Sequence, residues 1–175
     1  MTLPAIISDG LAWFLVCLFC QAAFHKLGAP RYYSQLMTRY VGRLGGGLAV
    51  WLVALLEAGV ALSLLLPQSR AAGLAVAAGL LLVYGGLMAS QVLRGETGMQ
   101  CGCAGPDSQL GISWALVARN GVCAGLALLA MTSGEAASAG WVGLIISLFV
   151  ALFAVLVYET SEQLISNAQW MAGES

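Results

Sequence analysis

The sequence has very little charge. Of its 175 residues only 9% are Asp, Glu, Lys or Arg, whereas soluble domains carry about a quarter. Seven basic against eight acidic residues leave a net charge of −1, which excludes the basic surface of a nucleic-acid-binding protein. Prolines number only four, while 60% of the residues are hydrophobic and 22 are glycine. Because small residues let helices approach closely in lipid, the composition predicts an all-α, polytopic membrane bundle.

The few charged residues divide the chain into apolar runs. A helix needs about 20 mostly apolar residues to cross the hydrocarbon core of a bilayer. No positively charged segment precedes the first run, so we expect no cleavable signal peptide. We predict a single membrane domain over residues 1–175, with a four-helix core plus one further helix, whose spans are Ile6–Phe24, Leu48–Leu66, Ala71–Leu93, Ile112–Met131 and Gly140–Tyr158.

Five spans assign each connection to one side of the membrane. The segments Lys26–Gly47 and Arg94–Gly111 and the tail from Glu159 share one side, which we call the loop face. The N-terminus and the connections Pro67–Arg70 and Thr132–Ala139 lie on the opposite side. Most of the polar side chains capable of redox, acid–base or ion-pair chemistry fall on or near the loop face.

The sharpest motif is Cys101-Gly102-Cys103 in the second loop-face segment. Two thiols two positions apart close a small, strained disulfide, and strained exposed disulfides are the labile ones. The pair also precedes the positive end of the fourth predicted helix, which favours a thiolate. The alternatives are a metal clip and two unpaired cysteines. Zinc normally takes four ligands with wider cysteine spacing, so we predict a redox pair and no metal.

A second pair of cysteines lies within the first span. Cys17 and Cys20 fall on one helical face near the loop-face end of that span. They are candidate inner relay partners of Cys101 and Cys103, although small buried hydrophobes are the common alternative. Cys123 lies deep in the fourth span and is expected to serve packing.

Two charged residues lie inside predicted spans. Glu57 is mid-span, where an ionised carboxylate costs about 2.5–3.5 kcal/mol on membrane-insertion scales. Arg119 lies about two turns into the fourth span, and a guanidinium cannot lose its proton. Both spans start at the loop face, so we predict a Glu57–Arg119 pair, with Asn120 as a further hydrogen-bond donor. Such a pair serves either function or bundle packing.

The first loop-face segment holds further candidates. His25 is placed to move a proton during thiol exchange, and His25-Lys26 supplies cations that depress a cysteine pKa. For Lys26 alone, snorkelling to the interface is the favoured alternative. Tyr and Arg recur in residues 30–33 and 39–43, which indicates an interfacial helix. That helix either covers the Cys101 loop or simply connects two spans along the membrane surface.

These motifs together resemble a known family. The elements are Phe24-His25-Lys26-Leu27, Glu57-Ala58-Gly59, Cys101-Gly102-Cys103-x-Gly105 and Arg119-Asn120. Their order and spacing are similar to those of the methylamine-utilisation MauE family, a branch of the DoxX-like membrane proteins. The resemblance covers nearly the whole chain from the first to the fourth span. It does not extend to Cys17 and Cys20.

The resemblance implies a role in maturing a disulfide-rich extracytoplasmic enzyme, the small subunit of methylamine dehydrogenase. The implied partners are a thioredoxin-like protein, the disulfide-containing client and the lipid bilayer of a bacterial inner membrane. The bundle also looks like that of vitamin-K-epoxide reductases, in which a membrane cysteine pair passes electrons to a quinone. By that fold-level analogy, Cys101 and Cys103 exchange disulfides with the soluble partner, and a quinone is the candidate cofactor.

The sidedness of the loop face is the point of conflict. All lysines and arginines except Arg70 lie on the loop face, which the positive-inside rule assigns to the cytoplasm. Disulfide formation favours the extracytoplasmic side, and we place the Cys101 loop there. Two other function classes fit the sequence: a non-catalytic scaffold that recruits a partner, and a small transporter using Glu57 and Arg119.

Overall fold

The computed structural model describes residues 3–42, 46–96, 100–102, 105, 110–132 and 140–173, and these residues are almost all helical. Within them a short 3₁₀ turn, Pro67–Ser69, separates α3 from α4. The α-helices are α1 (Leu3–Gly28), α2 (Pro30–Val41), α3 (Gly47–Leu65), α4 (Arg70–Leu93), α5 (Trp114–Thr132) and α6 (Trp141–Gly173). The predicted all-α class is confirmed.

Five of these helices are long and apolar enough to cross a membrane, namely α1, α3, α4, α5 and α6. The five predicted spans are therefore confirmed, with differences at their ends. The first helix runs about one turn further than predicted, to Gly28, and so carries His25 and Lys26 inside the bundle.

The fifth span differs most from its prediction. We expected it to end at Tyr158, but α6 continues to Gly173. Residues 159–172 contain polar and acidic side chains but neither proline nor glycine. Such side chains mark where an apolar run ends, but only proline and glycine strongly oppose a helix. The tail therefore continues the span as a helix.

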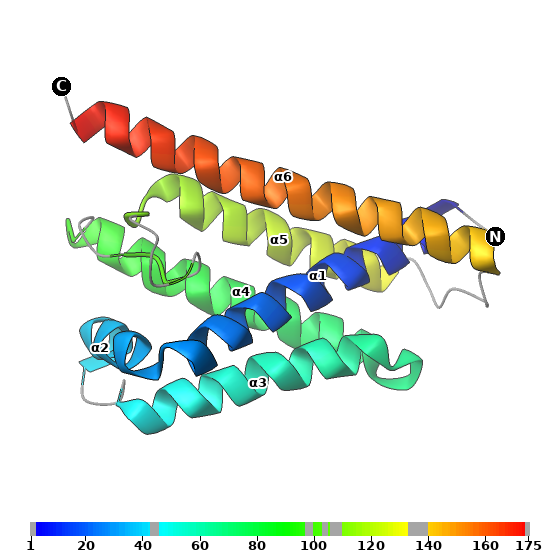
Figure 1. The fold of residues 1–175 in the computed structure, drawn as a ribbon, viewed down its shortest axis with the longest axis horizontal. Helices are drawn as coiled ribbons and strands as arrows, with labels where there is room; N and C mark the ends of the chain where they lie inside the picture. The colour runs from blue at the N-terminus through cyan, green and yellow to red at the C-terminus, as the bar shows by residue number, and fades with distance from the viewer. Residues whose placement is uncertain are drawn as a thin grey trace.

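The long helices run roughly along one axis, and their connections gather at two opposite ends (Figure 1). At one end lie α2, the segment between α4 and α5, and the C-terminus. The N-terminus, the Pro67–Ser69 turn and the start of α6 lie at the other. This arrangement agrees with the predicted loop face and its opposite. Helix α1 packs against α3 and α6, while α4 packs most extensively against α5.

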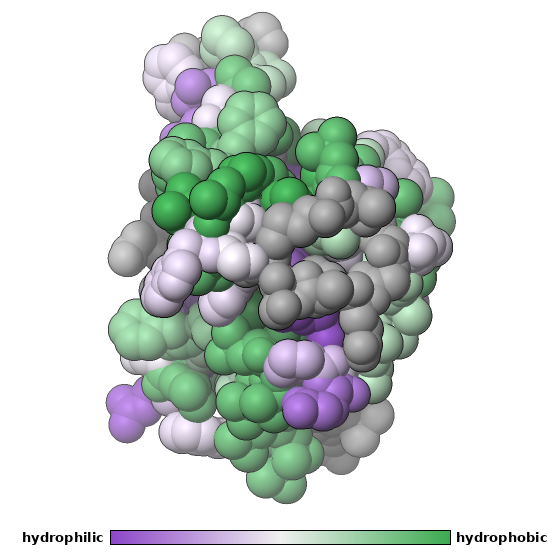
Figure 2. All heavy atoms as spheres, turned by 90° about the vertical axis from the view of Figure 1, so that its right-hand side faces the viewer, coloured by the Kyte–Doolittle hydropathy of each residue, from purple (hydrophilic) through white to green (hydrophobic). Residues whose placement is uncertain are grey.

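Two groups of buried apolar residues form the core. The larger joins α1, α3, α4, α5 and α6 and includes Phe14, Leu15, Leu64, Ala77 and Ala151. The smaller lies toward the loop face and contains Cys101. The end opposite the loop face shows scattered polar side chains among apolar ones (Figure 2).

Close contact between α1 and α6 requires a glycine. A Cβ added at Gly10 would lie 2.6 Å from Val150 Cβ and 2.8 Å from the carbonyl oxygen of Ser147. Gly10→Ala is therefore expected to lower the free energy of unfolding by about 1–3 kcal/mol. Gly86→Ala is the matched control, because no atom lies within 4 Å of a Cβ added there. Denaturant unfolding of the detergent-solubilised proteins measures both; equal stability of the two variants would contradict the close approach.

Candidate functional site

Helix α2 contacts the segment that carries Cys101. The Tyr32 hydroxyl donates a hydrogen bond to Gln100 Oε1 at 2.6 Å, and the Tyr40 hydroxyl donates to the Gln100 carbonyl at 3.4 Å. The Tyr33 side chain is almost completely buried. The sequence left open whether this helix covers the Cys101 loop or simply connects two spans. These contacts show that α2 covers the loop.

Cys101 is buried beneath this cover. Its sulfur lies 3.6 Å from the Met88 sulfur of α4, and its backbone N–H donates to the Leu110 carbonyl at 2.9 Å. Gly102 has a φ of +72°, a conformation that favours glycine, and a Cβ there would meet a Leu36 methyl at 2.4 Å. Cys103 lies outside the described residues, so the structure locates one of the two predicted thiols.

Burial affects the titration of the covering helix. It raises the pKa of the Tyr32 phenol above its ordinary value, and the neighbouring Cys101 thiolate raises that pKa further. Tyr32 is therefore protonated at neutral pH and able to donate its hydrogen bond to Gln100.

This hydrogen bond gives a prediction about access to the thiol. Tyr32→Phe removes one bond between α2 and the Cys101 segment, worth about 1 kcal/mol. We expect maleimide to react with Cys101 about fivefold faster in this variant, since 1 kcal/mol corresponds to roughly that factor. Thr38→Val is the control, because Thr38 bonds to the Ser34 carbonyl of its own helix. An unchanged rate in Tyr32→Phe would show that α2 does not restrict access.

A buried ion pair lies below α2. Lys26 Nζ is 2.7 Å from Glu57 Oε1, and the Tyr84 hydroxyl donates to the same oxygen at 2.7 Å. Glu57 has no exposed surface and Lys26 is only 7% exposed. The Lys26 ammonium also lies 5.6 Å from the ring centre of Tyr33 and 5.7 Å from that of Tyr84. Three helices thus share one polar group inside the bundle.

The predicted Glu57–Arg119 pair is wrong. Arg119 Nη1 lies 3.0 Å from Glu162 Oε2 of α6, and its guanidinium stacks 4.3 Å from the Tyr158 ring centre. Helix α3 packs on α1, α2 and α4, whereas α5 packs on α4 and α1. Equal depth in the membrane therefore did not bring Glu57 and Arg119 together. The snorkelling alternative for Lys26 is also wrong, because its ammonium is buried against Glu57.

His25 and Asn120 lie apart from this ion pair. A Cβ added at Gly105, close to the cysteine pair, would lie 3.2 Å from His25 Cε1. Among the described residues no hydrogen-bond partner faces the buried His25 Nδ1. The Asn120 amide donates to the Leu116 carbonyl of its own helix at 3.0 Å. His25 therefore lies near the thiol loop, while the Asn120 amide donates within its own helix and not to Glu57.

The other cysteines lie in two environments. Cys17 and Cys20 are exposed on the surface of α1, whereas Cys101 is buried under α2. Cys123 is buried in the larger apolar core, where we expected it to serve packing. The relay role of Cys17 and Cys20 stays a prediction.

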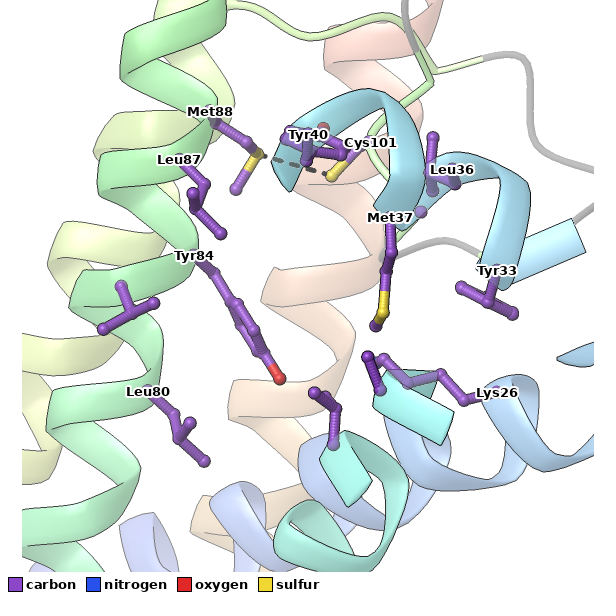
Figure 3. A pocket seen from close by; sticks show the side chains of 14 residues that line it. Lys26, Tyr33, Leu36, Met37, Tyr40, Leu80, Tyr84, Leu87, Met88 and Cys101 are labelled. Carbon is purple, nitrogen blue, oxygen red and sulfur yellow. Dashed lines mark hydrogen bonds between the residues drawn. The ribbon is translucent and has the colours of Figure 1, made fainter. Parts of the chain in front are cut away.

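A cavity of about 260 Å³ joins Cys101 to the buried ion pair. Its walls come from α1, α2, α3, α4 and the Cys101 segment, and Tyr84 and Met37 extend into it (Figure 3). Tyr84 and Met88 were missed by the sequence analysis. The sequence does contain a signal for Tyr84, because it places an aromatic hydroxyl in the middle of an otherwise apolar, charge-free span.

Comparison with known proteins covers the helices that build this site. A family model described as "Methylamine utilisation protein MauE" matches residues 4–133, from α1 through α5. The chain is 35% identical to the methylamine utilization protein MauE of Paracoccus denitrificans over 126 residues. These residues cover 71% of this chain and 68% of that protein. It is 37% identical over 139 residues to the Paracoccus versutus protein of the same name, covering 77% and 74%.

A third relative, the methylamine utilization protein MauE of Methylorubrum extorquens, is 34% identical over 124 residues, which cover 67% of this chain and 62% of the relative. No solved structure matches the chain. The matched region contains Lys26, Glu57, Tyr84 and Cys101, while Glu162 on α6 lies beyond it. The family match, the three relatives and the five apolar helices agree: this multi-pass membrane protein belongs to the MauE family of methylamine-utilisation proteins.

Proposed function

We propose that this protein is a membrane thiol–disulfide exchange factor that supports the maturation of a disulfide-rich extracytoplasmic enzyme. The main observation in support of this proposal is the position of Cys101. Its sulfur lies beside Met88 in the wall of a cavity that Lys26 also lines. The names of the relatives point to methylamine utilisation, and the proposed client is the methylamine dehydrogenase small subunit.

The proposed reaction is an exchange between Cys101–Cys103 and a thioredoxin-like partner. A thiolate of the partner attacks the disulfide, so that one partner–chain S–S bond forms while the Cys101–Cys103 bond breaks. The second partner thiolate then displaces the chain's cysteine. The partner leaves as a disulfide, two electrons and two protons remain on Cys101 and Cys103, and the partner oxidises the client in the same way.

Regenerating the disulfide requires a two-electron acceptor. The resemblance implies a quinone, and a bound quinone supplies a two-electron, two-proton acceptor. The chain's residues fit such a group, because the cavity is mostly apolar yet contains the Lys26 ammonium and the Tyr84 hydroxyl. Cys101 lines the same cavity.

We place the loop face on the extracytoplasmic side of a bacterial inner membrane. Lys26 and Arg119 are partners in buried ion pairs, so they are not loop charges in the sense of the positive-inside rule. The remaining loop-face cations, Arg31, Arg39, Arg43 and Arg94, still oppose this placement, which rests on the oxidising compartment that disulfide formation favours.

Trapping of a mixed disulfide tests this proposal. Cys17, Cys20 and Cys123 are first replaced by serine, and Cys101→Ser or Cys103→Ser is then added. With a thioredoxin-like partner whose second active-site cysteine is serine, at least one of the two single variants is expected to accumulate a reductant-sensitive adduct, since no second partner thiolate is left to displace the chain's cysteine. The matched control is the chain lacking both cysteines. If neither variant yields more adduct than that control, the proposal is wrong.

A further inference from the structure

The C-terminal end of α6 reaches the segment that carries Cys101. Helix α6 runs on to Gly173, and its end lies at the same end of the bundle as the segment between α4 and α5 (Figure 1). There the Gln169 side chain forms two hydrogen bonds with the backbone of Gly111. Its Oε1 accepts from the Gly111 N–H at 3.0 Å, and its Nε2 donates to the Gly111 carbonyl at 2.8 Å. Gln169 therefore binds Gly111 in the way that a neighbouring antiparallel strand would.

Gly111 belongs to a backbone stretch that pairs with the stretch around Cys101. It forms an antiparallel bridge with Gln100, and the Cys101 N–H donates to the Leu110 carbonyl at 2.9 Å. From the other side, the Tyr32 hydroxyl of α2 donates to the Gln100 side chain. The paired backbone is thus held by α2 at Gln100 and by α6 at Gly111.

Three residues near the end of α6 turn toward the bundle. Glu162, Ile165 and Gln169 are spaced by three and four positions, which places them along one side of a helix. Glu162 pairs with Arg119 at 3.0 Å, and Ile165 packs against the buried cluster that contains Cys101. Gln169 therefore approaches Gly111 from a part of α6 that is itself fixed to the bundle. All three residues lie beyond the region that the family model matches.

We infer that Gln169 is a positioning residue for Cys101. Acting through the Gly111 backbone, it keeps the Cys101 thiol against the Met88 sulfur. This inference rests on the proposed function, in which Cys101 is the reacting thiol. The Cys101 S–H donates to the Met88 sulfur at 3.6 Å, and both side chains are buried. Without the two hydrogen bonds from Gln169, the segment moves away from α4, which exposes the thiol and breaks the contact between the two sulfurs.

The S–H stretching band of Cys101 tests the inference, because its frequency falls when the thiol donates a hydrogen bond. The full chain has five cysteines, and serine at the other four leaves this single thiol for infrared spectroscopy. In Gln169→Ala we expect the band to shift toward that of Met88→Leu, which lacks the acceptor sulfur. Maleimide is expected to react about 5–30-fold faster with Cys101 in Gln169→Ala, the factor that corresponds to losing two hydrogen bonds.

Two control variants separate positioning from general effects. Gln163→Ala makes the same change at an exposed position of α6. Gly10→Ala disturbs the contact of α1 with Val150, about 28 Å along α6 from Gln169. Both controls are expected to keep the band position and the maleimide rate of the single-thiol chain. A shift in Gly10→Ala as large as that in Gln169→Ala would overturn the inference, because loss of stability alone would then move the thiol.

A second variant covers the case in which alanine disturbs folding. Gln169→Glu keeps the length of the side chain and an acceptor for the Gly111 N–H, but it removes the donor to the Gly111 carbonyl. We expect it to shift the band in the same direction as Gln169→Ala. An unchanged band and an unchanged rate in both Gln169 variants would overturn the inference. These measurements use neither the partner nor the client, so the mixed-disulfide trap judges the proposed thiol exchange separately.

Discussion

Glu57→Gln is expected to lower the free energy of unfolding by about 3–5 kcal/mol, because it leaves a buried cation without its counter-charge. Glu57 has no exposed surface and accepts from both Lys26 and Tyr84. Glutamine has nearly the same shape and still offers an oxygen to both donors. The loss therefore reports the charge pair and not the packing. Unfolding of the purified protein by denaturing detergent measures it.

A double variant separates the stability contribution of the whole Lys26–Glu57 ion pair from the cost of leaving one of its charges unpaired. Lys26→Met combined with Glu57→Leu removes both charges, and replacing a whole buried ion pair by apolar residues is often close to neutral. We expect it to be clearly more stable than Glu57→Gln alone. Glu159→Gln is the control, since within the described part of the chain Glu159 accepts only one long, exposed hydrogen bond, from the Gln21 amide at 3.5 Å. A Glu57→Gln variant as stable as Glu159→Gln would refute the buried pair.

Cys101→Ser is expected to reduce oxidation of the client to the background seen without this protein. Serine preserves the size of the side chain but forms no disulfide, so neither half of the proposed exchange proceeds. The fraction of oxidised client, measured by alkylation and gel shift in cells, reports the loss. Immunoblotting of the membrane fraction shows whether the variant accumulates normally.

Variants of Cys17 and Cys20 extend this experiment. Cys17 and Cys20 are exposed on α1. If they form an inner relay, Cys17→Ser with Cys20→Ser reduces client oxidation as Cys101→Ser does. If they are only membrane-facing small residues, client oxidation is retained. Normal client oxidation in Cys101→Ser itself would contradict the thiol mechanism.

The architecture was predictable because lipid imposes a simple rule on sequence. Charge-free runs longer than the bilayer thickness must be helices, and their number fixes which connections share a side. The placement of α2 over Cys101 was one of two alternatives left by its Tyr and Arg pattern. Its hydrogen bonds to Gln100 decide between them.

The wrong ion pair shows what the sequence could not supply. Depth along a span is readable from residue number, but lateral position in a bundle depends on how five helices pack. The sequence analysis paired Glu57 with Arg119, but the packing of α1 on α3 brings Lys26 to Glu57 instead. Glu162 was overlooked as the partner of Arg119 because the tail was not expected to continue as α6.

The most direct test of the central claim is the redox state of Cys101 and Cys103 in membranes. In a chain whose other cysteines are serine, a maleimide reagent of known mass is added with and without prior reduction. The account predicts that the isolated membranes contain a population with neither thiol labelled, and that mild reduction converts it to one with both labelled. Full labelling of both thiols before any reduction, under conditions in which the client is being oxidised, would contradict it.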